Sequence, residues 1–230
     1  MMNLKDTIFV ITGASGATGS VIADNLHRAG AQVVGLNFRG EPRLSLTEQR
    51  TGFHALTLDL GNTAEVLQAY EMIKHHRGAI SVWINTVGGF HMGQRVEDSE
   101  PDTWDQQWQV NFKTTLNTAQ VILPHFREQG QGRLINFGSA AALDGLATAG
   151  PYIVSKAAVH ALTRTIAAEL EGDITCNAIL PTTIDTPANR KAMPDADFSQ
   201  WVTPLEIAAK IVEIIEGDMN GELIIPGSDG

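Results

Sequence analysis

The residues best suited to do chemistry include a tyrosine and a lysine four positions apart, Tyr152 and Lys156, in the segment PYIVSK (151–156). Pro151 suits the first turn of a helix, and residues four apart share one helix face. A neighbouring ammonium group favours the phenolate and lowers the pKa of a phenol from its usual value of about 10. The pair therefore suits acid–base chemistry near neutral pH. Taken alone, it also fits an amphipathic helix whose tyrosine and lysine lie side by side at the surface.

A glycine-rich turn, TGASGATG (12–19), follows the first apolar run of the chain. Its three glycines leave room for the backbone to approach a pyrophosphate, whose charge is favoured at the N-terminus of the following helix. The turn by itself also fits a plain, tight connection between a strand and a helix. Its placement after a first strand favours the binding function. The residues predicted to contact a dinucleotide here are Gly13, Ser15, Ala17, Thr18 and Gly19.

The end of the second apolar run, LNFRG (36–40), bears on the choice between NAD and NADP. An acidic residue there would bind the ribose hydroxyls and repel a 2′-phosphate. Asn37 lacks that repulsion, and Arg39, beside Phe38, has a guanidinium group suited to phosphate. We therefore expect NADP(H) to be favoured, with NAD(H) possible; a solvated arginine in a loop is the alternative. Further cofactor contacts are predicted after the third and fourth runs, at Asp59, Leu60, Thr86, Val87 and Gly88.

The elements that must position these residues alternate between short apolar runs and longer helical patterns. Strands are predicted at 7–12, 32–37, 53–58, 80–85, 133–138, 173–180 and 221–226, and helices at 17–29, 63–76, 101–129, 151–171 and 204–216. Near-continuous apolar strands are typical of a sheet covered on both faces. The repeating strand–helix order predicts one α/β domain over residues 1–230, a Rossmann-like doubly wound sheet of about seven parallel strands.

Composition narrows the possible partners. The formal net charge of −10 makes nucleic acids and anionic membranes poor partners. Cys176, the single cysteine, can form no intrachain disulfide and no thiolate metal cage, and we expect a buried, inert thiol. No metal site is predicted, because no His, Asp and Glu pattern resembles one. No run approaches the length of a membrane span or a secretory leader, so we expect a cytoplasmic protein.

Taken together, the chain resembles the short-chain dehydrogenase/reductase family over nearly its whole length. The resemblance rests on TGASGATG, Asp59, NTVG (85–88), Asn111, Ser139 and the Tyr152–Lys156 pair, in the family's order and spacing. It implies hydride transfer between nicotinamide and a carbonyl or alcohol. Tyr152 would exchange the proton of the substrate oxygen, Ser139 would hydrogen-bond that oxygen, Lys156 would bind the nicotinamide ribose, and Asn111 would hold a relay water. It also implies cofactor contacts from Pro181, Thr182, Ile184 and Thr186, and a homodimer or homotetramer formed by the helices near 104–129 and 151–171.

The polar segment of about 182–203 corresponds to the family's substrate lid. Residues 180–206 also resemble quinonoid dihydropteridine reductase, a divergent branch that reduces a pteridine. Ser139 departs from that branch, so a carbonyl or alcohol substrate is preferred and a dihydropterin is the alternative. Phe90, His91 and Trp201 are the candidate substrate residues, with Trp201 also interpreted as an anchor of the lid; His160 is assigned to packing or an interface. A non-catalytic dinucleotide sensor is the remaining hypothesis, since fold alone does not establish function.

Overall fold

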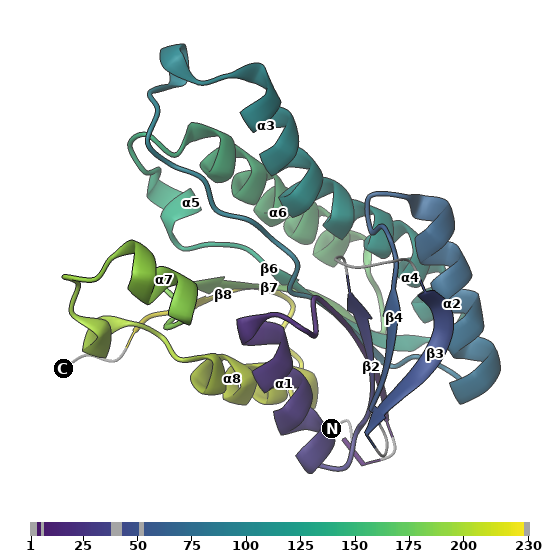
Figure 1. Ribbon diagram of the computed structural model, residues 1–230. Coiled ribbons are helices and arrows are strands. Elements are labelled where there is room, and N and C mark those ends of the chain that lie inside the picture. Colours follow the sequence, from purple (N-terminus) through teal and green to yellow (C-terminus); the bar gives the residue numbers. More distant parts are fainter. Residues whose placement is uncertain (1–3, 6, 38–42, 51–52, 228–230) are drawn as a thin grey trace.

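The computed structural model describes residues 4–5, 7–37, 43–50 and 53–227, and its centre is one eight-stranded sheet (Figure 1). The strand order is β3-β4-β2-β1-β5-β6-β7-β8. The strands are β1 (Ile8–Thr12), β2 (Gln32–Asn37), β3 (Arg43–Arg50), β4 (Phe53–Thr57), β5 (Val82–Asn85), β6 (Gln131–Phe137), β7 (Asp173–Pro181) and β8 (Gly221–Ile225). Seven of them run parallel, which confirms the predicted Rossmann-like architecture.

The edge strand β3 was not predicted. It pairs antiparallel with β4 through an irregular register. Its sequence, RLSLTEQR, lacks the continuous apolar run that identifies the buried parallel strands, so the sequence pattern does not predict this strand.

Helices cover both faces of the sheet (Figure 1). They are α1 (Ala17–Arg28), α2 (Thr63–Arg77), α3 (Pro101–Gln107), α4 (Thr114–Gln129), α5 (Ala141–Asp144), α6 (Gly150–Glu169), α7 (Pro187–Ala192) and α8 (Pro204–Glu216), with short helices η1 (Val96–Asp98), η2 (Trp108–Lys113) and η3 (Phe198–Gln200). None of the helices in the described part of the chain has the length and hydropathy of a membrane span.

Two hydrophobic clusters pack against the two faces of the sheet. Phe9 and Ile11 of β1 join the cluster that contains α1 and α8, whereas Ile8 and Val10 join the cluster of α2, α4 and α6. This division follows from the alternation of side chains along a strand. Because both faces are buried, β1 is apolar at every one of these positions.

The helix predicted at 101–129 is interrupted in its middle. A π-helical segment, η2, separates α3 from α4 and contains Asn111. π-helical turns inside longer helices frequently occur at functional sites. The 3.6-residue period cannot reveal such a turn, because one wider turn hardly disturbs the apolar pattern.

The predicted lid is more regular than its composition indicated. It contains α7 and η3, although the sequence showed no clear period there. The start of α7 has a local cause: Thr186 caps it by accepting a hydrogen bond from the Asn189 amide, and Pro187 occupies its first turn.

Candidate active site

The glycine-rich turn connects β1 to the N-terminus of α1 and touches the end of β5. Gly13 has a φ of +69°, and an added Cβ there would lie 2.9 Å from Thr86 Oγ1. A Cβ at Gly19 would lie 2.2 Å from the Gly13 carbonyl oxygen, so neither position has room for a side chain. The turn therefore keeps bare backbone at a helix N-terminus, which fits a pyrophosphate.

Asn37 ends β2 beside this turn, and the Ser15 amide donates a hydrogen bond to its Oδ1 at 3.2 Å. At the end of β2 an amide therefore stands where a carboxylate would repel a 2′-phosphate. Phe38 and Arg39 lie outside the described residues. Asp59 is exposed, and its Oδ1 accepts a hydrogen bond from the Gly61 amide at 2.8 Å.

The side chain of Leu60 is fully buried in the hydrophobic cluster beneath α2 and α4, so only its backbone could meet an adenine ring, and the predicted contact stays a prediction. The apolar identity of this residue reflects core packing.

The segment after β5 links the glycine-rich turn to the catalytic candidates. The Thr86 amide donates to Thr12 Oγ1 at 3.1 Å, and the Val87 amide lies 3.4 Å from the same oxygen. A Cβ at Gly88 would lie 2.9 Å from Asn111 Oδ1 and 3.2 Å from Lys156 Nζ. Asn111 and Lys156 thus converge on Gly88, and a side chain there would displace both.

Asn111 is fully buried, and its side chain holds the loop after β5. Its Oδ1 accepts from the Gly89 amide at 2.9 Å, and its Nδ2 lies within 3.1 Å of the Gly89 carbonyl, Gln107 Oε1 and Ser155 Oγ. Every polar atom of the amide is therefore engaged by protein groups. The Asn111 side chain thus positions the loop after β5. The predicted proton-relaying water held by Asn111 stays a prediction.

Ser139, Tyr152 and Lys156 meet where β6 ends. Lys156 Nζ donates a 2.7 Å hydrogen bond to the carbonyl oxygen of Phe137, two residues before Ser139. A hydrogen bond between the Ser139 and Tyr152 side chains lowers the pKa of the phenol. The predicted Ser–Tyr–Lys set is thus brought together by β6 and α6.

Burial shifts the pKa values of Tyr152 and Lys156 so that the neutral form of each side chain is favoured. It raises the pKa of the Tyr152 phenol, opposed by the Ser139 hydrogen bond, and lowers the pKa of the Lys156 ammonium to about 8. The expected lowering of the tyrosine pKa by Lys156 is therefore wrong for the protein alone, because desolvation dominates. The phenol is protonated at neutral pH and suited to donating a proton.

Residues after β7 close the other side of the site. The Pro181 carbonyl accepts a hydrogen bond from the Ala140 amide, next to Ser139, and the Thr182 amide bonds to Ile225. Ile184 forms a β-bridge with Val202, which ties the two ends of the lid together. Pro181 therefore lies beside the catalytic segment, and the cofactor contacts of Thr182, Ile184 and Thr186 stay predictions.

The three candidate substrate residues have different environments. Phe90 is 55% exposed, and its ring lies edge-on to Tyr152 with 4.8 Å between centroids. His91 is half-buried in the same loop. Trp201 is 7% exposed and packs against Phe198, which favours its interpretation as an anchor of the lid; its contact with substrate stays a prediction.

Cys176 is fully buried in β7, and burial raises the pKa of its thiol to about 12. This confirms the predicted buried, inert cysteine.

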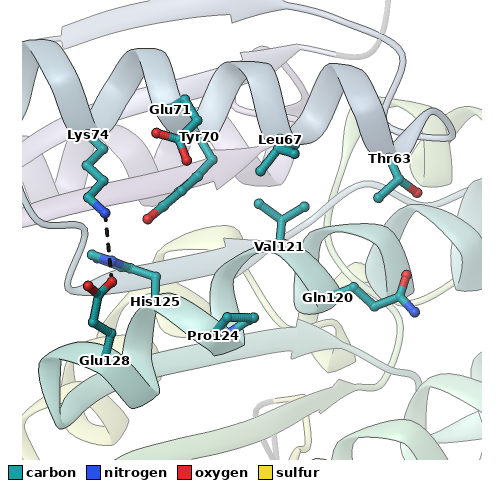
Figure 2. Close-up of a pocket in the computed structure, with 10 residues that line it drawn as sticks. All are labelled: Thr63, Leu67, Tyr70, Glu71, Lys74, Gln120, Val121, Pro124, His125 and Glu128. Atoms are coloured by element: carbon teal, nitrogen blue, oxygen red, sulfur yellow. Dashed lines mark ion pairs between the residues drawn. The ribbon is translucent and has the colours of Figure 1, made fainter.

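A hollow of about 430 Å³ lies between α2 and α4, away from these residues (Figure 2). Tyr70, Leu67, Val121 and Pro124 form its apolar wall, and Lys74 and Glu128 form an ion pair across it at 3.8 Å. No predicted catalytic, cofactor or substrate residue lines it. The candidate active site is instead formed by the residues at the carboxyl ends of the strands.

Similarity to known proteins assigns the chain to a family. The sequence model of the short chain dehydrogenase family matches residues 7–197. The chain belongs to this family. An uncharacterized oxidoreductase of Staphylococcus aureus is 31% identical over 212 residues, covering 88% of this chain and 91% of the relative. One from Staphylococcus epidermidis is 30% identical over 190 residues, covering 81% and 82%.

Solved structures show the same fold. Aldohexose dehydrogenase of Thermoplasma acidophilum has a TM-score of 0.82 at 24% identity, covering 96% of this chain and 93% of its own. Gluconate 5-dehydrogenase of Burkholderia cenocepacia, solved with NADP and tartrate, has a TM-score of 0.83 at 23% identity, covering 98% and 96%. The family is thus established, and this protein is a short-chain oxidoreductase. The likeness of the lid to dihydropteridine reductase stays a prediction.

Sequence reasoning missed two polar residues of α6 at the site. Ser155 accepts from Asn111 and donates to the Tyr152 carbonyl at 2.7 Å. His160 is 2% exposed and accepts a hydrogen bond from the Ser139 amide, so its assignment to packing was incomplete. The sequence offered one signal of this role: His160 lies four residues after Lys156, so the two share one helix face.

Proposed function

We propose that this protein is an NAD(P)-dependent oxidoreductase that reduces a small carbonyl compound, or oxidises the corresponding alcohol, through Ser139, Tyr152 and Lys156. The observation that carries the proposal is the convergence of these three residues and Asn111 around Gly88 and the end of β6. The nicotinamide cofactor supplies the hydride when bound.

The residues of the chain supply the remaining chemistry. The Ser139 hydroxyl donates a hydrogen bond to the substrate oxygen, where negative charge develops during reduction. The Tyr152 phenol, protonated at neutral pH, donates a proton to that oxygen. Lys156 is anchored beside it by the Phe137 carbonyl and has an ammonium group free to reach a ribose hydroxyl with its remaining donors.

We infer that NADP(H) is the favoured cofactor. The crowded backbone at Gly13 and Gly19 fits a dinucleotide pyrophosphate, and Asn37 presents an amide where a carboxylate would exclude the 2′-phosphate. NAD(H) remains an accepted cofactor in this proposal, because an asparagine does not repel the free ribose hydroxyls.

A second candidate activity is the reduction of a quinonoid dihydropterin. The exposed ring of Phe90, edge-on to Tyr152, offers an aromatic surface for a flat heterocycle next to the proton donor. The retained Ser139 favours the carbonyl reaction over this one.

The test compares NADPH and NADH oxidation by the purified protein with a simple diketone and with quinonoid dihydropterin. We expect turnover of the diketone, more efficient with NADPH, and a loss of about 10²–10⁴-fold in kcat for Tyr152→Phe. Fast turnover of the pterin alone would favour the second candidate. Cofactor binding without turnover of any substrate in a broad carbonyl panel would favour a dinucleotide sensor.

A further inference from the structure

The end of β6 has a backbone donor that no strand satisfies. The amides of Gly138 and Ala140 bond to Ile179 and Pro181 of the β7 side. The amide of Ser139, between them, points to the opposite side, where β5 would continue. The last residue pair of β5 and β6 is Asn85 with Asn136, so β5 has ended before this point.

His160 replaces the missing strand. Its Nε2 accepts the Ser139 amide hydrogen at 3.1 Å, and its ring is 2% exposed. A buried amide without a partner would cost folding free energy, so this bond fixes the backbone of Ser139. The fit is tight, because a Cβ added to Gly138 would lie 2.3 Å from His160 Nε2.

Lys156 and His160 hold this segment from one face of α6. Lys156 donates to the carbonyl of Phe137, and His160 accepts from the amide of Ser139. The two side chains lie four residues apart on the helix that also carries Tyr152. The same helix thus sets the proton donor and the backbone from which the Ser139 hydroxyl projects.

The ring must keep Nε2 free of a proton to accept this bond. The single proton of the neutral ring then lies on Nδ1, which is 3.9 Å from Glu222 Oε1 of β8. Glu222 is itself paired with Arg164 at 2.8 Å. Glu222 favours the charged imidazole, whereas burial, Arg164 and Lys156 oppose it, and burial dominates, so the pKa of His160 is lowered.

We propose that His160 is a positioning residue for catalysis: its Nε2 holds the Ser139 backbone so that the serine hydroxyl faces the substrate oxygen, and it does so only as the neutral Nδ1–H tautomer. This inference rests on the proposed function of Ser139. It predicts that protonation of His160 breaks the bond, since a doubly protonated ring has no acceptor.

The kinetic test uses three variants. His160→Leu removes the acceptor at similar volume and should lower kcat about tenfold, as expected for leaving a buried donor unpaired. His160→Gln offers Oε1 as an acceptor that does not titrate. It should restore most of kcat and should lack the decline in rate toward acidic pH that we expect of the wild type. His125→Leu is the control. His125 is another buried histidine, in α4, and its ring makes no hydrogen bond to the Ser139 segment.

A double-mutant cycle separates positioning from general destabilisation. In a Ser139→Ala background the hydroxyl is gone, so His160→Leu should cost little further activity. Equal costs in both backgrounds would overturn the proposal, as would a rate unchanged by His160→Leu while Tyr152→Phe is inactive. Full activity of Tyr152→Phe would instead refute the proposed function.

A second measurement is independent of turnover. ¹⁵N NMR of the imidazole in the whole protein at neutral pH should show an unprotonated Nε2 and a protonated Nδ1 for His160, assigned by their loss in His160→Gln. A proton on Nε2 would exclude the Ser139 bond and refute the inference even if the enzyme is active.

Discussion

Tyr152 and Lys156 are shifted by the same physical cause in opposite directions. Burial disfavours charge, so it raises the pKa of the phenol and lowers that of the ammonium. The site thus holds a protonated tyrosine next to a lysine whose pKa is lowered to about 8. For reduction of a carbonyl this is the useful state, because the phenol has a proton to give.

The pKa of Lys156 also makes stability depend on pH. The folded value of about 8 lies below the reference value of 10.5, so between these values the unfolded chain binds a proton that the folded protein does not. Stability therefore rises with pH across this window, and the full cost of burying the charge applies below it.

We expect the free energy of unfolding of the wild type, relative to Lys156→Met, to rise by about 2–3 kcal/mol between pH 7 and pH 10. Urea unfolding at both pH values measures it, and pH 10 is the upper limit because the raised pKa of Tyr152 brings an opposite trend above it. A pH-independent difference between the two proteins would show that the Lys156 amine is not desolvated.

At the scale of elements, two similar helix caps serve different purposes. Thr186 caps α7, which has no buried residue, whereas Thr203 caps α8 through a reciprocal pair with Glu206. Helix α8 buries Ile207, Ile211 and other residues against the sheet. The first cap orders the lid, and the second supports the core.

Thr186→Ala should therefore raise KM for the substrate and speed proteolysis within 186–193, with little change in the thermal midpoint. Thr203→Ala should cost about 1 kcal/mol of global stability and leave KM unchanged. Steady-state kinetics and thermal unfolding of both variants provide the comparison. A global loss of stability from Thr186→Ala would mean that α7 belongs to the cooperative core.

The sequence predicted those elements whose burial leaves a periodic pattern. The seven parallel strands and the long helices are apolar because they are covered, and their residues could be identified directly. The polar edge strand β3, the short helix α7 and the π-helical turn leave no such pattern. The strand β3 depends on its pairing with β4, the helix α7 on its cap by Thr186, and the π-helical turn on a local change in the helical hydrogen bonds.

The same distinction holds within the site. Tyr152, Lys156, Ser139 and Asn111 could be predicted because their residue types and spacing are themselves the signal. The role of His160 depends on where β5 ends, and the burial of Leu60 and Trp201 depends on tertiary packing. Spacing along the chain does not contain this information.

At the scale of the whole molecule, the site draws on residues from Gly13 to Thr186. The carboxyl ends of parallel strands meet at one edge of a sheet. The strand order changes direction at β1, because β2 lies on one side of it and β5 on the other. The Thr12–Thr86 and Ala140–Pro181 hydrogen bonds join neighbouring strand ends across this edge. The candidate active site is therefore assembled only when these strands have paired into the sheet.

The helices around the site also present apolar side chains to solvent. Trp108 of η2 is 38% exposed and Val154 of α6 is 47% exposed, and these two elements pack against each other. Exposed apolar groups of this size favour association between copies of a chain. The homo-oligomer stays a prediction, and Trp108 and Val154 are the side chains that we expect at its contact.

We expect light scattering after size exclusion to give at least twice the 24.8 kDa mass of one chain. Trp108→Glu and Val154→Glu should shift the protein toward the single-chain mass, because a charge at the contact must be desolvated. Met193→Glu is the matched control, since Met193 is similarly exposed at 40% but lies in the lid. A wild-type protein that elutes as a 24.8 kDa particle would refute the predicted assembly and leave the exposed Trp108 and Val154 without an oligomeric role.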